Sequence, residues 1–131
     1  MATQAKAVVH TDAAPAPFQG APYSQAIRAN GLVFVSGQLA LRPDHAEIVG
    51  EGIAEQTEQV FANLSAILEA AGTSLANLVK TTVFLQNLDD FAGMNEVYTK
   101  HVGDRPPARS TVEVAKLPSG ALVEIEAIAL L

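Results

Sequence analysis

The chain is 131 residues long, and its fourteen acidic and eight basic side chains give it a formal net charge of −6. At roughly 100 to 200 residues per domain, this length predicts one domain over residues 1–131 and excludes a cofactor domain beside a separate substrate domain. Hydrophobic residues make up 49% of the chain and charged residues 17%, a balance typical of a folded protein. Aromatic residues make up only 5%, so we expect an aliphatic core.

Charge and cysteine content exclude several classes of protein. The eight basic residues never form a run, although a nucleic-acid surface needs clustered positive charge. Cysteine is absent, which excludes disulfides, thiolate metal sites and a cysteine nucleophile. The first residues hold no apolar run of signal-peptide length, and no stretch approaches the roughly 20 apolar residues that span a bilayer. We therefore expect a cytoplasmic protein with neither a nucleic-acid partner nor a membrane partner.

Three segments of the N-terminal half have clear local signals. Residues 11–24 carry three prolines and one glycine among small residues, which predicts an irregular lead-in. Residues 31–38, GLVFVSGQ, are β-branched and aromatic and predict a buried strand. Residues 53–71 predict a helix that ends at Gly72, because large apolar side chains recur there with the helical period of 3.6 residues. These side chains are Val60, Phe61, Leu64, Ile67 and Leu68.

The C-terminal half is expected to supply three strands and a second helix. Residues 79–85, VKTTVFL, predict a strand, and Asp89 or Asp90 is placed to cap a helix that ends near Gly103. The segments ARSTVEVAKL and LVEIEAIALL, joined by LPSGA, predict a two-stranded hairpin. This order of elements predicts an α+β fold in which two helices cover one face of a mixed sheet. The inner side of the second helix would present Phe91, Met94, Val97, Tyr98 and Val102.

The predicted hairpin separates two charged residues of interest. A turn centred in LPSGA sets Arg109 opposite Leu130, six positions from Glu124, or about 20 Å along the strand. The two side chains then cannot meet within one chain, so any cooperation between them requires a subunit interface. Strand alternation places Glu124 and Glu126 on one face with apolar Ile128, where an unpaired carboxylate is costly to bury. The alternative is that these residues form ordinary ion pairs on a solvated face.

Other site chemistries have little support in the sequence. The three histidines lie far apart and form no metal-binding spacing, so we expect no metal site. No glycine-rich phosphate loop is present, and Ser36 stands in SGQ rather than in a nucleophile elbow. We therefore expect neither dinucleotide binding nor covalent serine catalysis.

Several motifs together resemble the RidA (YjgF) family of reactive-intermediate deaminases. They are APYSQAI, VSGQ, KTTVFLQNLDDFAGMNEVY, and PARSTVEVAKLP followed by VEIEAIA, in the family's order over about residues 21–130. The resemblance implies a homotrimer of chorismate-mutase-like α+β subunits with clefts between neighbours. It also implies a 2-iminobutanoate/2-iminopropanoate deaminase, which hydrolyses imines arising from pyridoxal-phosphate dehydratases to 2-oxo acids and ammonia. The expected ligands are small 2-imino and 2-oxo acids, and no cofactor or metal would be required.

The resemblance assigns three residues to catalysis. Arg109 would bind the substrate carboxylate through two parallel hydrogen bonds. Glu124 would hold the attacking water and accept its proton, and only the motif selects it over Glu126. Thr111 would contact the same water, from a position where enterobacterial and animal relatives carry cysteine.

Three further residues are carried over as parts of the binding pocket. Tyr23 and Ser36 would close and polarise the pocket. Asn95 would join them from the second helix, although its spacing from Phe91 and Tyr98 also suits a residue that only buttresses the cleft.

Two other functions use the same residues. A non-catalytic module would bind a 2-oxo acid in the cleft, or a protein partner on the trimer surface, without turnover. An RNA-acting protein is a third hypothesis, and the net charge of −6 and the scattered basic residues count against it.

Overall fold

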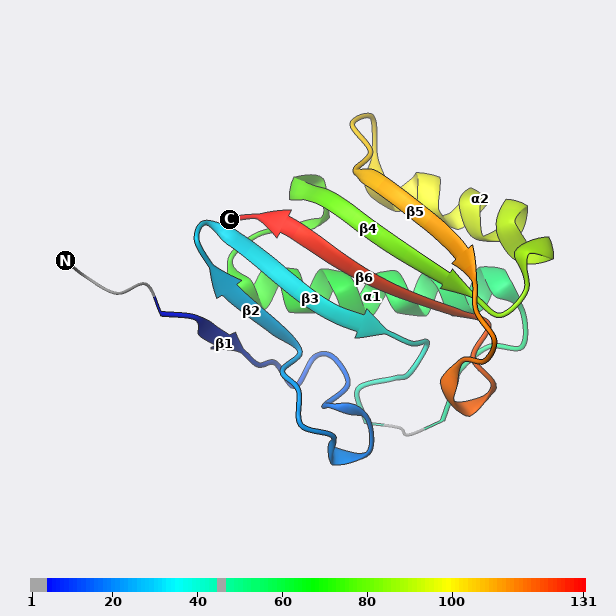
Figure 1. Cartoon of the computed structure of the whole chain (residues 1–131), viewed down its shortest axis with the longest axis horizontal. Coiled ribbons are helices and arrows are strands. Elements are labelled where there is room, and N and C mark those ends of the chain that lie inside the picture. The colour runs from blue at the N-terminus through cyan, green and yellow to red at the C-terminus, as the bar shows by residue number, and fades with distance from the viewer. Residues whose placement is uncertain (1–4, 45–46) are drawn as a thin grey trace.

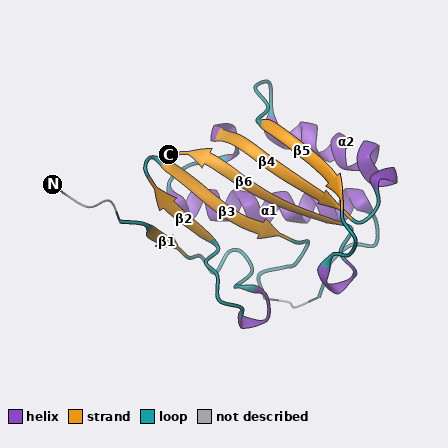
Figure 2. Cartoon of the chain, in the orientation of Figure 1, coloured by secondary structure: helices purple, strands orange, loops and turns teal. Residues whose placement is uncertain are grey.

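The computed structural model describes residues 5–44 and 47–131, which form a six-stranded mixed sheet with two α-helices on one face (Figures 1 and 2). The strands are β1 (Ala7–Val9), β2 (Ala26–Ala29), β3 (Leu32–Gln38), β4 (Leu78–Leu85), β5 (Ala108–Glu113) and β6 (Val123–Leu130), and the helices are α1 (Ile53–Ala71) and α2 (Phe91–Val102). The strand order is β1-β2-β3-β6-β4-β5. The predicted α+β class, with two helices on one face of a mixed sheet, is confirmed.

Helix α1 forms where its apolar stripe predicts and ends at the predicted glycine. Gly72 takes a left-handed backbone with φ of 96°, and its N–H donates to the Glu69 carbonyl, which closes the helix. The stripe of α1 is fully buried and packs across β3 and β6. Within residues 5–44 and 47–131, no helix is long and apolar enough to cross a membrane.

Helix α2 has the predicted extent but not the predicted aspartate cap. Asp90 occupies the N-cap position, and its side chain makes no capping hydrogen bond. The polar contact lies one turn earlier, where Asn87 Oδ1 accepts the Asp89 N–H at 2.8 Å in a short 3-10 helix. The cap prediction is wrong because this 3-10 turn leads directly into α2 and supplies its first hydrogen bonds.

The core lies between the two helices and the sheet face that they cover. It is mainly aliphatic, as the composition predicts, and Phe61 of α1 meets Tyr98 of α2 edge to face at 5.5 Å between ring centres. Each residue of β6 that faces the helices is buried, and these residues are Val123, Ile125, Ala127 and Ala129. The helices therefore leave the opposite face of the sheet open.

The predicted C-terminal hairpin is wrong, because β4 lies between β5 and β6 (Figure 1). Strand β5 runs parallel to β4 with Arg109 opposite Thr81, and β6 runs antiparallel to β4 with Glu124 opposite Phe84. Parallel neighbours need a crossover connection, and α2 provides it between β4 and β5. Residues 114–122 then carry the chain past the end of β4 instead of closing a tight turn.

Two short N-terminal strands, β1 and β2, have no counterpart in the prediction. Strand β2 joins β3 through Asn30 and Gly31, whose φ angles are 54° and 78°. Asn-Gly is the preferred pair for such a tight hairpin turn, so a usable signal was present in the sequence. Residues 11–24 form no strand, as predicted, and contain the 3-10 turn Phe18–Gly20.

Candidate functional site

The open face of the sheet carries two carboxylates on β6. Because side chains alternate along a strand, Glu124 and Glu126 point away from the helices. Glu124 is half-buried, whereas Glu126 is exposed. The two residues thus share a face, as predicted, but differ in their contact with solvent.

Both carboxylates line a pocket of about 360 Å³. Strand β6 contributes the two glutamates, β3 contributes Ser36 and Gly37, and the lead-in segment contributes Tyr23. The remaining lining residues, Phe18, Leu39 and Pro118, are apolar. A pocket of this size, with a few polar groups against an apolar wall, is typical of small-molecule sites.

Gly37 makes room for the Glu124 carboxylate. A Cβ atom at Gly37 would lie 2.0 Å from Glu124 Oε2. The register between β3 and β6 also shifts between Val35 and Gln38, which marks a bulge beside the glutamate. Sequence reasoning did not single out Gly37, although a glycine inside a strand is a signal for such a close approach.

The pocket changes the acidity of Glu124. Burial raises the pKa of the Glu124 carboxyl above its usual value of 4.5, and the nearby Glu126 carboxylate raises this pKa further. The shift brings the carboxyl nearer to the range in which it can both accept and return a proton.

Hydrogen bonds fasten the lead-in segment beside this pocket. Ser36 Oγ donates to the Ser24 carbonyl at 2.6 Å, and the Ser36 N–H donates to the Gln25 carbonyl at 3.0 Å. The Tyr23 hydroxyl accepts the Phe18 N–H. The structure therefore brings Tyr23 and Ser36, two of the predicted site residues, to the pocket that holds Glu124.

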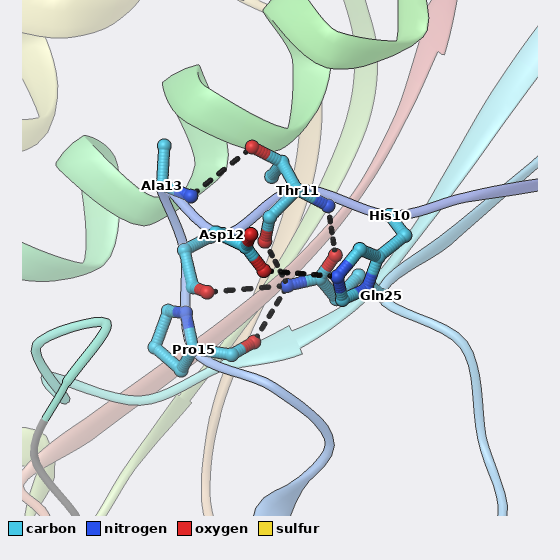
Figure 3. A network of polar contacts seen from close by, with 7 residues as sticks. His10, Thr11, Asp12, Ala13, Pro15 and Gln25 are labelled. Carbon is cyan, nitrogen blue, oxygen red and sulfur yellow. Dashed lines mark hydrogen bonds and ion pairs between the residues drawn. The ribbon is translucent and has the colours of Figure 1, made fainter.

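Gln25 anchors the other end of the lead-in segment (Figure 3). Its side chain is 2% exposed, and Nε2 lies 2.8 to 3.3 Å from the carbonyl oxygens of Thr11, Ala14 and Pro15. Its Oε1 accepts the Thr11 N–H at 2.8 Å. Sequence reasoning missed this residue, because nothing local distinguishes a buried glutamine from an exposed one.

Arg109 and Asn95 meet on the opposite side of the sheet, next to α2. Arg109 Nη1 donates to Asn95 Oδ1 at 2.8 Å. The guanidinium carbon lies 4.6 Å from the ring centre of Tyr98 and 5.4 Å from that of Phe91. These contacts hold the guanidinium in one direction while leaving most of its donors available for an anion.

Thr111 lies on β5 on the same strand face as Arg109. Its hydroxyl oxygen is buried and has no hydrogen-bond partner within residues 5–44 and 47–131. Buried hydroxyl groups are normally paired, so this one is suited to a group from outside the described chain.

The predicted site residues therefore form two separate groups. One group holds Glu124 with Tyr23 and Ser36 on the open face, and the other holds Arg109 with Asn95 beside α2. Arg109 and Glu124 do not meet within the chain, as expected. The expected reason, their spacing along a hairpin, is wrong, because β5 and β6 do not pair. The two residues lie on opposite faces of the sheet with β4 between their strands.

Metal-ligating side chains do not gather in the described part of the chain. Across residues 5–44 and 47–131, no group of three His, Asp or Glu side chains is arranged to hold a metal ion. The chemistry that the two groups of residues offer is anion binding by a guanidinium and proton transfer by a carboxylate.

This fold and these residues define a member of a known class. Residues 11–131 match the family model described as endoribonuclease L-PSP, and the chain belongs to this family, the RidA (YjgF) proteins. The family predicted from the sequence motifs is thus confirmed.

Particular relatives carry different names. A RutC family protein from Pyrococcus abyssi is 51% identical, over 95% of this chain and 97% of its own length. The chloroplastic Reactive Intermediate Deaminase A from Arabidopsis thaliana is 50% identical, over 96% of this chain and 66% of its own. The 2-iminobutanoate/2-iminopropanoate deaminase of Mus musculus is 42% identical, over 98% of this chain and 94% of its own length.

A solved structure has the same fold. The E. coli protein TdcF with bound serine superposes with a TM-score of 0.87 at 38% identity, covering 95% of this chain and 98% of its own. Relatives with deaminase names support deaminase chemistry at the level of the family.

Proposed function

We propose that this protein is a 2-iminobutanoate/2-iminopropanoate deaminase that hydrolyses small 2-imino acids to 2-oxo acids and ammonia. The observation that carries the proposal is the half-buried Glu124 carboxylate, with its raised pKa, in a pocket of about 360 Å³. The deaminase name of the mouse relative, 42% identical over nearly the whole chain, supports the same reaction.

Glu124 is the proposed proton carrier. It would hold a water molecule against the imine carbon and take one proton as the water oxygen bonds to that carbon. Returning this proton to the nitrogen gives a carbinolamine, which carries a hydroxyl and an amino group on the same carbon. The carboxylate would then move the hydroxyl proton to the amino nitrogen, so that the carbon–nitrogen bond breaks, ammonia leaves and the carbonyl of a 2-oxo acid forms. Ser36 and Tyr23 line the same pocket, and their hydroxyl groups would orient the water and the imine.

Arg109 is the proposed carboxylate-binding group, and it would come from a neighbouring subunit. Its guanidinium is directed by Asn95 and Tyr98 on the far side of the sheet from Glu124 of the same chain. A complete site therefore requires a second chain, which we propose to be supplied by a homotrimer. Thr111 lies two residues from Arg109 on the same strand face. Its hydroxyl, which has no partner within residues 5–44 and 47–131, would then reach the same cleft.

Trapping of the imine tests this proposal directly. An amino-acid oxidase generates the imine from alanine, and semicarbazide traps whatever is not hydrolysed first. We expect the protein to lower the rate of semicarbazone formation, Arg109→Ala to remove this effect, and Arg28→Ala, a change of an exposed arginine on β2, to leave it intact. An equal trapping rate with and without protein would refute the enzyme function.

A non-catalytic binding role is the second candidate, favoured by the E. coli relative whose structure holds serine. It predicts that 2-oxobutanoate binds by calorimetry while the trapping rate does not change. An RNA-acting role, suggested by the description of the family, would require RNA cleavage that survives Arg109→Ala. Cytoplasmic location, a single domain and the lack of a nucleic-acid partner stay predictions.

A further inference from the structure

One aromatic side chain of the lead-in segment lies where three cavities meet. Phe18 lines the Glu124 pocket, an outer groove of about 350 Å³, and a cavity of about 20 Å³ behind Tyr23. Among the described lining residues, only Phe18 belongs to both the pocket and the groove. Phe18, which is half-buried, therefore lies at the boundary between them.

The chemistry of the substrate indicates which part of the pocket would take the substrate side chain. An imine carbon is planar and carries three groups, namely the carboxylate, the nitrogen and the substrate side chain. If Arg109 binds the carboxylate and Glu124 works at the carbon and nitrogen, the side chain must point toward another part of the pocket. The apolar lining residues Phe18, Leu39 and Pro118 are the part suited to an alkyl group.

The outer groove offers the same chemistry on the other side of Phe18. Most of its lining is apolar and includes Pro15, Pro17, Leu41 and Pro43, while Gln19, Asp44 and Ser119 add polar groups. A substrate side chain that extended from the pocket into this groove would have to pass Phe18.

Hydrogen bonds hold the backbone around Phe18, which fixes the point from which its side chain projects. The Tyr23 hydroxyl accepts the Phe18 N–H, and the Gly20 N–H donates to the Pro17 carbonyl at 3.0 Å. Gln25 fixes the preceding segment through the Pro15 carbonyl (Figure 3). A substitution at position 18 would thus remove the ring while these backbone contacts remain.

We propose that Phe18 sets the longest substrate side chain that the pocket accepts, and that the outer groove is an apolar side-chain subsite closed off by its ring. This proposal rests on the proposed deaminase function. It adds that the limit to methyl and ethyl side chains is steric and is set by Phe18.

The test compares imines made by an amino-acid oxidase from alanine and from leucine. For each imine, kcat/KM is obtained from competition with semicarbazide. In wild type we expect a clear preference for the alanine-derived imine. Phe18→Ala should raise the leucine-to-alanine ratio of kcat/KM by at least about 10-fold, the usual effect of a few methylene groups in an apolar pocket.

Two controls isolate the ring from other effects. Phe18→Tyr keeps an aromatic ring at this position and should keep the wild-type leucine-to-alanine ratio of kcat/KM. Pro43→Ala changes the groove, which Pro43 lines, without touching the Glu124 pocket, and should also leave the ratio unchanged. A loss of stability alone would lower both rates together and would not move their ratio.

The outcomes separate this inference from the proposed function. A folded Phe18→Ala variant with an unchanged ratio would overturn the role of Phe18, while the deaminase function would stand on the wild-type rates. If Phe18→Ala does not fold, Phe18→Leu takes its place, with a smaller shift expected and an unchanged ratio again overturning the role. If wild type accelerates neither imine, the function fails and the inference fails with it.

Discussion

Glu124 combines two properties that a surface glutamate lacks. It is half-buried, which raises its pKa, and it lies against Gly37, the only residue type that leaves space for its carboxylate. Glu126 shares its strand face and its pocket but is exposed to solvent. Strand alternation alone could not separate the two glutamates, because the distinction depends on what β3 places beside each of them.

Replacing the Glu124 carboxylate tests its role in both activity and stability. We expect Glu124→Gln to lower kcat/KM by at least about 100-fold, the usual contribution of a general acid or base. Because the folded pKa lies above 4.5, ionised Glu124 makes the wild type lose stability as the pH rises from 4.5 through that pKa. Denaturant unfolding should therefore show Glu124→Gln at least as stable as wild type at pH 7, with the difference vanishing near pH 4.

Gly37 offers an independent test that replaces none of the proposed catalytic side chains and only shifts one of them. In Gly37→Ala the new methyl group would overlap the end of the Glu124 side chain, which is flexible and can move. We expect an activity loss of roughly 10- to 100-fold from this misplacement, with little change in melting temperature. Gly52→Ala is the matched control, since its new methyl group meets nothing closer than 3.9 Å. Full activity in Gly37→Ala would show that the position of the carboxylate is not critical.

At the level of elements, local patterns predicted what each segment becomes, but not always which segments are neighbours. The α1 stripe and the β4 run are strong local signals, and both elements lie within one residue of the predicted bounds. The pairing of β5 was mispredicted, because two strands joined by a short loop look like a hairpin whether or not a third strand lies between them. The crossover through α2 instead places β5 parallel to β4, at the edge of the sheet.

The first part of the lead-in segment, residues 11–15, is held through the Gln25 side chain, and this can be tested on its own. Gln25→Met keeps the size of the side chain but leaves three carbonyls and one N–H without their partner. We expect the free energy of unfolding to fall by about 1 to 3 kcal/mol and proteases to cut residues 11–17 faster. Gln56→Met, at an equally buried glutamine that holds Gly50 and Leu122, should lower stability without exposing this segment. Equal cutting in both variants would contradict the anchoring role.

On the scale of the whole molecule, the open sheet face is more apolar than a solvent-facing surface usually is. It carries Phe34, Val112 and Leu130, which are 41%, 42% and 49% exposed. Large apolar side chains exposed on one face are typical of a surface that another chain covers. The same face holds Glu124, whereas Arg109 of the same chain points away from it. In the proposed assembly, the chain that covers this face would also supply the arginine that the Glu124 pocket lacks.

Mixing two inactive variants tests this shared site most directly. Arg109→Ala and Glu124→Gln chains are unfolded together and refolded in equal amounts, and each variant refolded alone is the control. If the site combines Arg109 of one chain with Glu124 of its neighbour, random mixing restores both groups at about one quarter of the sites, and deaminase activity returns to about that fraction of wild type. If both groups had to come from one chain, no mixed assembly would contain a complete site, and a mixture as inactive as its two components would contradict the account.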